Sequence, residues 1–182
     1  NDALIKAAKW ADYAIGFEDG DANPKTAVIA RRGASRWRLD VSATSAHSSQ
    51  IFQPSIGSGA IFEIASILEK FRHELNRYEN LTFNPGLIAG GSSVNIDPER
   101  KEASVRGKDN IIASQASLMG DLRAVSKEQL ASAKKVMDEI TRNQSQHYTT
   151  TLSFLDGYPP MDATTGNKRL LRMYDQVSQD LG

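Results

Sequence analysis

The chain has 182 residues, of which 40% are hydrophobic, and its 22 Lys and Arg are balanced by 22 Asp and Glu. A net charge of zero argues against the sequence-independent nucleic-acid binding that a basic surface supplies, and it gives no electrostatic reason to expect a membrane as partner. The lack of cysteine excludes disulfides, thiolate zinc sites and cysteine nucleophiles.

The first residues predict a helix followed by a buried strand. Apolar residues at helical spacing indicate a helix over about 3–11, and the apolar run at 13–17 has the length of a strand covered on both faces. A polar cluster that begins with Glu18 follows this run. In open α/β sheets ligands bind at this edge of the strands, although a solvated loop explains the same cluster.

The next segments predict two strands, a loop and a helix. Residues 26–30 and 37–43 read as strands joined by a glycine-containing hairpin turn at 32–35. A polar loop over 44–59 contains His47. The helix behind this loop has an apolar face formed by Ile61, Ile64, Leu68, Phe71 and Leu75.

The second half of the chain predicts two strands, a helix and a last strand. Residues 81–91 form a strand broken at Pro85, residues 97–100 an exposed turn, and residues 115–123 an alternating strand. Ser126, with Gln129 three positions later, is a capping-box start for a helix. The Thr-rich segment 147–155 is the last strand.

With the 26–43 hairpin counted as one strand position, this order predicts an α+β fold with a four-stranded antiparallel sheet and two helices on one face, in the ferredoxin-like order β-α-β-β-α-β. We expect three parts in the chain. Residues 1–25 are a stub of an α/β body, residues 26–155 form the sheet domain, and residues 156–182 are a linker and an amphipathic helix that return to the body.

The three histidines do not form a metal-ligand pair by spacing. His73 falls near a helix end and His147 at a strand start, where surface roles are typical. His47 lies in a Ser/Thr-rich loop directly after a strand, from which a side chain can reach a ligand, although the pattern alone favours an exposed loop histidine without a ligand.

A second group of candidates is Asn110, Asp121 and Arg123. Asp121 and Arg123 are two residues apart on one strand face, so they can pair with each other as a structural salt bridge. Alternatively the Arg123 guanidinium can hold an anionic substrate, because its geometry matches a carboxylate bidentately.

Four segments, in this order, carry a resemblance to a known family. They are Ala-Asp-Tyr-Ala-Ile-Gly-Phe-Glu at 11–18, the segment 43–48 that ends in Ala-His-Ser, Asn-Ile-Ile-Ala-Ser at 110–114, and Gly-Asp-Leu-Arg at 120–123. Together they resemble the lid (dimerisation) domain, with flanking catalytic-domain stubs, of the co-catalytic zinc metallopeptidases. That family includes glutamate carboxypeptidase, acetylornithine deacetylase, succinyl-diaminopimelate desuccinylase and aminoacylase.

The resemblance implies a role for each matched residue. Glu18 would be a metal ligand, and His47 would stabilise the oxyanion, in dimeric members from the partner subunit. Asn110 and Arg123 would bind the carboxylate end of the substrate, and Asp121 would orient Arg123.

Two departures from the family pattern affect this transfer. The family commonly has glycine shortly after the lid histidine, where this chain has Ser48 and Ser49. It also often opens the lid helix with Asn-Ala, where this chain has Gly59 and Ala60. Both loosen the correspondence around the loop without removing a candidate side chain.

As a whole, the resemblance implies that the full-length parent is a peptidase or deacylase with two zinc ions. It would cleave the C-terminal bond of a small peptide or the amide bond of an N-acyl amino acid, and would form a homodimer through the lid. The other metal ligands and the general base would lie outside residues 1–182, so we expect an inactive fragment without a tight zinc site. The alternative is a stand-alone ferredoxin-like regulatory or ligand-binding dimerisation module.

Overall fold

The computed structural model describes residues 1–17, 23, 25–97, 99–143 and 146–181. The chain divides into two units, one formed by Asn1–Arg31 with Met161–Gly182 and the other by Arg32–Pro160. None of the helices in the described ranges combines the length and the apolarity needed to cross a bilayer.

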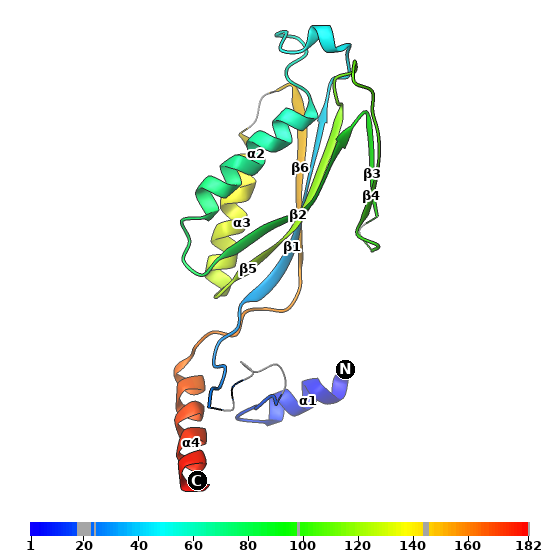
Figure 1. The fold of residues 1–182 in the computed structure, drawn as a ribbon. Helices are drawn as coiled ribbons and strands as arrows, with labels where there is room; N and C mark the ends of the chain where they lie inside the picture. Colours follow the sequence, from blue (N-terminus) through cyan, green and yellow to red (C-terminus); the bar gives the residue numbers. More distant parts are fainter. Residues whose placement is uncertain (18–22, 24, 98, 144–145, 182) are drawn as a thin grey trace. The chain divides into compact units, whose positions relative to one another are not determined.

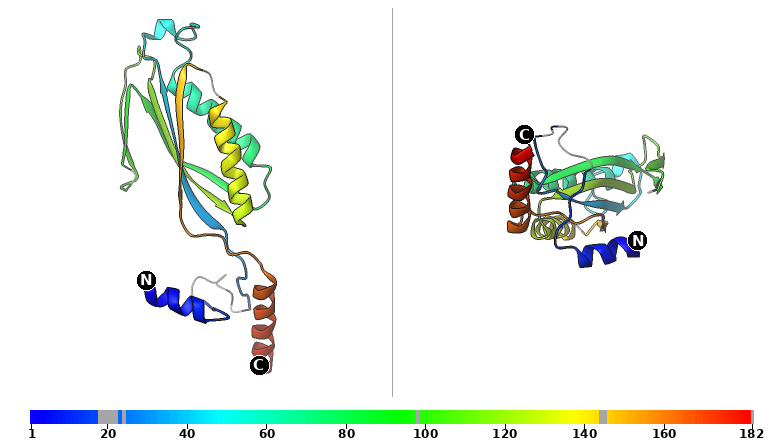
Figure 2. Two further views of the ribbon diagram at one scale, coloured as in Figure 1. Left: turned by 180° about the vertical axis from the view of Figure 1, so that it is seen from behind. Right: turned by 90° about the horizontal axis from the view of Figure 1, so that it is seen from below.

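The larger unit is built on a four-stranded sheet in the order β2-β5-β1-β6, in which every neighbouring pair is antiparallel. The strands are β1 (Gly33–Ala43), β2 (Thr82–Gly91), β5 (Gln115–Ala124) and β6 (Tyr148–Asp156). Helix α2 (Ala60–Leu75) joins β1 to β2, and α3 (Lys127–Arg142) joins β5 to β6. Both helices lie on one face of the sheet (Figures 1 and 2), which confirms the predicted ferredoxin-like fold.

The core lies between this face and the two helices. Trp37 on β1 is 2% exposed, and its ring stacks on Phe83 with centroids 5.0 Å apart and meets the edge of Phe71 at 6.0 Å. The Trp37 indole also donates a hydrogen bond to the backbone oxygen of Asp121 at 3.2 Å. A buried tryptophan thus has both its apolar surface and its N–H satisfied, as stable cores require.

Helix α2 confirms the predicted element but not all of its predicted face. Ile61 is 49% exposed, whereas Ile67, which the prediction left out, is fully buried. The apolar residues of the buried stripe are Ala60, Ile64, Ile67, Phe71 and Leu75, and the buried Glu63 lies beside them. These positions recur at intervals of three and four residues, so the contact with the sheet selects one stripe and leaves Ile61 at its border.

Helix α3 begins as predicted. The Ser126 side chain accepts a hydrogen bond from the Gln129 N–H at 3.1 Å, and the Gln129 side-chain oxygen accepts one from the Val125 N–H at 3.0 Å. In a capping box the side chain three residues into the helix accepts from the N-cap N–H, whereas here Gln129 accepts from Val125, the residue before the N-cap. The Val125 N–H, which has no partner within the helix, is thereby hydrogen-bonded.

A second, two-stranded sheet was predicted only as a turn. Strands β3 (Ser93–Asp97) and β4 (Glu102–Arg106) pair antiparallel around that turn. The hairpin lies on the side of the large sheet away from the helices (Figures 1 and 2), and the Val94 N–H donates to the Gln115 side chain at 2.8 Å.

The predicted hairpin turn at 32–35 is wrong, because residues 33–35 belong to β1 and residues 26–30 form no strand. Gly33 pairs with Ala124 on β5, and Ser35 pairs with both Leu122 and Asp156. A Cβ atom at Gly33 would lie 2.5 Å from the Pro160 nitrogen, so this glycine allows a close backbone approach and does not form a turn.

The smaller unit contains helices α1 (Asp2–Trp10) and α4 (Thr165–Leu181), which confirm both predicted terminal helices. The strand predicted at 13–17 is wrong, since these residues are exposed and pair with no strand among the described residues. An apolar run of strand length was therefore not enough to predict a strand here. A strand also needs a neighbouring strand that pairs with its backbone N–H and C=O groups.

Candidate functional site

His47 and Asn110 lie together at the end of the sheet where β1 finishes and β5 starts. The Ile112 N–H donates to the Ala46 oxygen at 2.8 Å, and the Ser48 N–H donates to the Asn110 oxygen at 2.9 Å. These two bonds join the loop after β1 to the segment before β5, and His47 forms an isolated bridge with Ile111. Both candidate side chains belong to exposed residues.

The His47 ring is oriented by its own loop. His47 is the N-cap of the short 3-10 helix η1 (Ser48–Gln50), and its Nδ1 accepts a hydrogen bond from the Ser49 N–H at 3.2 Å. The Ser49 hydroxyl lies 2.9 Å from the same nitrogen. A backbone N–H can only donate, so the neutral ring carries its proton on Nε2 and offers it as a donor.

Arg123 lies at the other end of β5, beside the start of β1. Its Nε donates to Asp121 Oδ2 at 2.9 Å, and its Nη1 donates to the Tyr158 hydroxyl at 3.3 Å. The hydrogen bond with Asp121, followed by the electrostatic interaction with Tyr158, raises the pKa of the Arg123 guanidinium above its usual value. Nη2 has no hydrogen-bond partner within the described ranges, so it stays available to a ligand.

The structure therefore forms two pairs and keeps them apart. His47 lies with Asn110, and Asp121 lies with Arg123, but β5 from Gln115 to Arg123 spans about 27 Å at ~3.4 Å per residue of an antiparallel strand. Asn110 and Arg123 do not meet within one chain. Glu18, the predicted metal ligand, lies outside the described residues.

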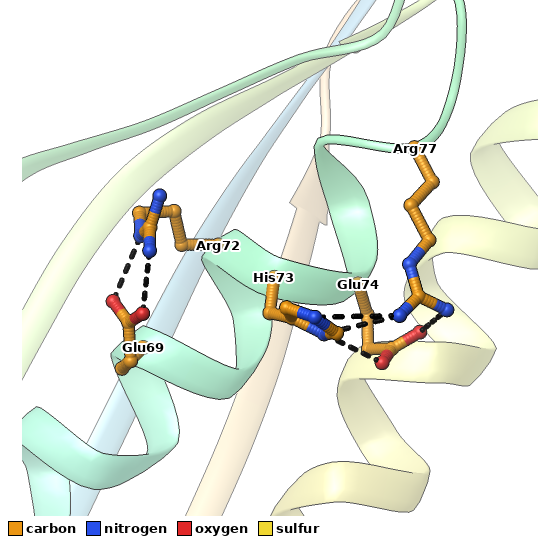
Figure 3. A network of polar contacts seen from close by, with 5 residues as sticks. All are labelled: Glu69, Arg72, His73, Glu74 and Arg77. Atoms are coloured by element: carbon orange, nitrogen blue, oxygen red, sulfur yellow. Dashed lines mark hydrogen bonds and ion pairs between the residues drawn. The ribbon is translucent and has the colours of Figure 1, made fainter.

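The other two histidines take part in ordinary contacts. His73 lies on α2 in an exposed charge network, where its Nδ1 is 3.0 Å from Glu74 and 3.2 Å from Arg77 (Figure 3). His147 packs edge-on against Tyr148 with ring centroids 6.3 Å apart. Over the described part of the chain, no three His, Asp or Glu side chains gather closely enough to hold a metal ion.

A comparison with protein families decides the assignment of the larger unit. The family model described as the peptidase dimerisation domain matches residues 29–149. The chain belongs to this family. No curated protein gives a significant match.

Solved structures share the fold of this dimerisation domain. A tripeptidase from Staphylococcus aureus is 20% identical with a TM-score of 0.64, and the match covers 85% of this chain and 37% of that one. Aminopeptidase PepT from Bacillus cereus is 16% identical with a TM-score of 0.58, covering 85% and 37%. A hydantoinase/carbamoylase-family amidase from Burkholderia multivorans is 14% identical with a TM-score of 0.55, covering 74% and 30%. The chain thus spans 30–37% of the length of these three structures.

The dimerisation domain has an exposed apolar surface beside the edge strand β2. It consists of Phe52, Ile61, Phe62 and Ile88, which are 66%, 49%, 56% and 57% exposed. The Phe52 and Phe62 rings lie 5.8 Å apart. A Cβ atom at Gly90 would lie 2.6 Å from Ile61, so this side chain packs directly on β2. We call these four residues the apolar patch.

Sequence reasoning missed three residues that hold the candidate side chains in place. Ser49 was visible only as a departure from the family pattern, and Tyr158 falls in a segment predicted as a linker. The Tyr148 hydroxyl accepts a hydrogen bond from the Ser58 N–H at 2.9 Å and thereby fixes the end of the His47 loop to β6. No local sequence pattern marks Tyr148 or Tyr158, because their partners are distant in the chain.

Proposed function

We propose that a longer protein containing this dimerisation domain hydrolyses an amide bond next to a free carboxylate, either the C-terminal bond of a small peptide or the bond of an N-acyl amino acid. The family match and the peptidase and amidase names of the similar structures support this reaction class. The observation that carries the proposal is Arg123, a guanidinium fixed by Asp121 and Tyr158 with Nη2 left available for the carboxylate.

His47 is proposed to stabilise the oxyanion that forms on the substrate carbonyl. Its Nδ1 is occupied by Ser49, so the ring presents Nε2–H, the donor that this role requires. Asn110, joined to the same loop by the Ser48–Asn110 hydrogen bond, is proposed to contact the substrate from the same side. Asp121 orients Arg123.

The longer protein is proposed to use two zinc ions, with Glu18 as one ligand, and zinc would supply an activated water for the hydrolysis. The described residues of this chain do not offer a set of ligands for it. We therefore propose that residues 1–182 alone bind no zinc tightly and turn over no substrate.

The domain is proposed to form a homodimer through the apolar patch and the edge of β2. The family is a dimerisation domain, and the patch exposes four large apolar side chains next to one sheet edge. In a two-fold dimer whose β2 strands run antiparallel, the His47 end of one chain lies beside the Arg123 end of its partner. A site that uses both residues is then formed by two subunits.

Sedimentation of the chain tests the interface. We expect Phe62→Glu to weaken the dimer by at least tenfold, because it places a charge in a buried apolar contact. The matched control is Leu155→Glu, which changes an apolar side chain that is 58% exposed on the opposite edge strand β6. If both variants dissociate equally, or neither does, the patch is not the interface.

The reaction is tested in the longer protein. His47→Ala is expected to lower kcat by roughly 10²–10³-fold, the effect of removing one oxyanion donor. Arg123→Gln is expected to abolish the preference for substrates with a free carboxylate over the same substrates with a carboxamide. Arg72→Gln, on the opposite face of the sheet domain, is the control for loss of one exposed positive charge.

Complementation distinguishes a site between subunits from a site within one. Co-expressed His47→Ala and Arg123→Gln chains form mixed dimers in which one site has both wild-type residues. We expect about a quarter of the wild-type activity, since about half of the dimers are mixed and each has one intact site. Activity no higher than that of either variant alone would place both residues in the same subunit.

A further inference from the structure

Three arginines gather on the sheet face away from the helices, at the Arg123 end. Arg123 on β5 is directly opposite Ala34 on β1 and Thr82 on β2. Arg36 is two residues along β1 from Ala34 and points to the same face, so it is a diagonal neighbour of Arg123 at ~7–8 Å between Cα atoms. We call Arg32, Arg36 and Arg123 the arginine cluster.

Arg32 joins the cluster through a hydrogen bond to Thr82 on β2. Its Nη1 donates a hydrogen bond to the Thr82 hydroxyl at 3.0 Å, and Thr82 is the direct β2 neighbour of Arg123. The Arg32 guanidinium is thereby fixed next to the Arg123 position, although the two residues are far apart in the sequence.

The charges of the cluster are not balanced locally. Asp121 pairs with Arg123, and the nearby Arg38 is paired with Asp40 through two hydrogen bonds of 2.7 and 2.9 Å. Arg36 is directly opposite Asp121 but makes no hydrogen bond or ion pair with any residue that the structure describes. Among the described residues, three cations therefore face one carboxylate on this part of the sheet, in a chain whose total charge is zero.

We propose that the arginine cluster selects substrates whose carboxyl-terminal residue is acidic. This inference rests on the proposed function, in which Arg123 binds the α-carboxylate. Arg36 then binds the side-chain carboxylate of an aspartate or glutamate residue, for which a second guanidinium within one diagonal spacing has the required charge and reach. Arg32 adds a third positive charge to the field at this position.

The test compares N-acylglutamate with N-acylglutamine, which differ in charge but hardly in shape, as substrates of the longer protein. We expect kcat/KM to favour the glutamate substrate by about 10–100-fold, the effect of one charge-assisted hydrogen bond. Arg36→Gln is expected to remove most of this preference, whereas Arg72→Gln leaves it intact. A wild-type protein without the preference, or a preference that persists in Arg36→Gln, overturns the proposal.

The same variants separate this proposal from the proposed function. If Arg123→Gln impairs hydrolysis of both substrates while Arg36→Gln alters neither, the carboxylate site stands and only the selectivity is refuted. If Arg123→Gln alters neither, the proposed function itself fails.

Binding to the chain alone gives a readout independent of turnover. In NMR titrations with N-acetylglutamate, the Nε–H signals of Arg36 and Arg123 are expected to shift together, and added salt should weaken the effect. N-acetylglutamine should shift the Arg123 signal alone. Equal shifts of Arg36 with both probes contradict the proposed contact.

Discussion

Gly59, directly before α2, has a backbone conformation that few other residues can adopt. Its φ of 83° and ψ of 166° fall in a region occupied almost only by glycine, and other residues there cost about 1–3 kcal/mol. A Cβ atom at this position would also lie 2.6 Å from the Ile112 side chain and 3.2 Å from the Ala113 oxygen. Ile112 is 5% exposed and has little space to move, so overpacking adds about 1–3 kcal/mol.

Gly59→Ala is therefore expected to lower the free energy of unfolding by about 2–6 kcal/mol, a large share of the ~5–15 kcal/mol typical of a domain. The matched control is Gly86→Ala. There a Cβ atom would meet only Asn84 at 3.6 Å and Met119 at 3.8 Å, which are ordinary contacts. We expect this control to change the stability by less than about 1 kcal/mol in either direction.

Urea unfolding followed by tryptophan fluorescence measures the difference. Trp37 is buried in the dimerisation domain, whereas Trp10 is 87% exposed and contributes a nearly constant background. The two variants should share one m-value and differ in their midpoints. If Gly59→Ala is within about 1 kcal/mol of Gly86→Ala, the assignment of strain to Gly59 is refuted.

Three further predictions concern single side chains. Glu63 is 8% exposed, and its Oε1 has no hydrogen-bond partner among the residues that the structure describes. Burial raises the pKa of this carboxyl, so the stability that Glu63 contributes is complete below its ordinary pKa of 4.5 and is lost as pH rises through the raised pKa. Glu63→Gln should flatten this part of the stability–pH curve in urea titrations, and an unchanged slope would contradict it. Ser126→Ala removes the N-cap hydrogen bond of α3 and should lower the free energy of unfolding by about 1 kcal/mol in the same urea titration. An unchanged free energy would show that this hydrogen bond does not stabilise the helix. Ser49→Ala removes the hydroxyl but keeps the backbone N–H that donates to Nδ1, so the neutral His47 ring should remain protonated on Nε2 in ring ¹⁵N shifts; a proton moved to Nδ1 would refute this assignment of the ring.

Most of the fold could be predicted because its strands and helices have strong hydrophobic periods. The alternation at 115–123 corresponds to β5, and the capping box at Ser126 corresponds to the start of α3. The hairpin of β3 and β4 was missed although both strands alternate polar and apolar residues, in Ser-Val-Asn-Ile-Asp at 93–97 and Glu-Ala-Ser-Val-Arg at 102–106. Each strand has only five residues, and the polar turn between them was predicted on its own, without the short strands on either side.

Gly33 illustrates an error that local reasoning could not avoid. Glycine between two apolar runs is the usual mark of a turn, and 32–35 was predicted as one. In the structure the same glycine lies within β1, where Pro160 passes so closely that no Cβ fits. Pro160 lies 127 positions after Gly33 in the sequence (160 − 33), so the two residues come into contact only when the chain has folded.

The candidate site could be predicted residue by residue but not in its geometry. The resemblance named His47, Asn110 and Arg123, and it implied that Asn110 and Arg123 share the substrate carboxylate. The distance between Asn110 and Arg123 is set by the length of β5, which the resemblance did not take into account. Asn110 precedes β5 and Arg123 lies near its end, so an extended strand must separate them within one chain.

This separation limits how a single site can use all three residues. His47 and Asn110 stay together because backbone hydrogen bonds join their loops, and these bonds would have to break before either residue could approach Arg123 of the same chain. Bending β5 would in turn disrupt its pairing with both β1 and β2 and displace the core residues Leu118 and Leu122. A second copy related by a two-fold axis meets the same requirement without breaking any of these bonds, because it reverses the direction of the strand. The proposed two-fold dimer would therefore bring the His47 end of one chain beside the Arg123 end of its partner and leave the hydrogen bonds of both chains intact.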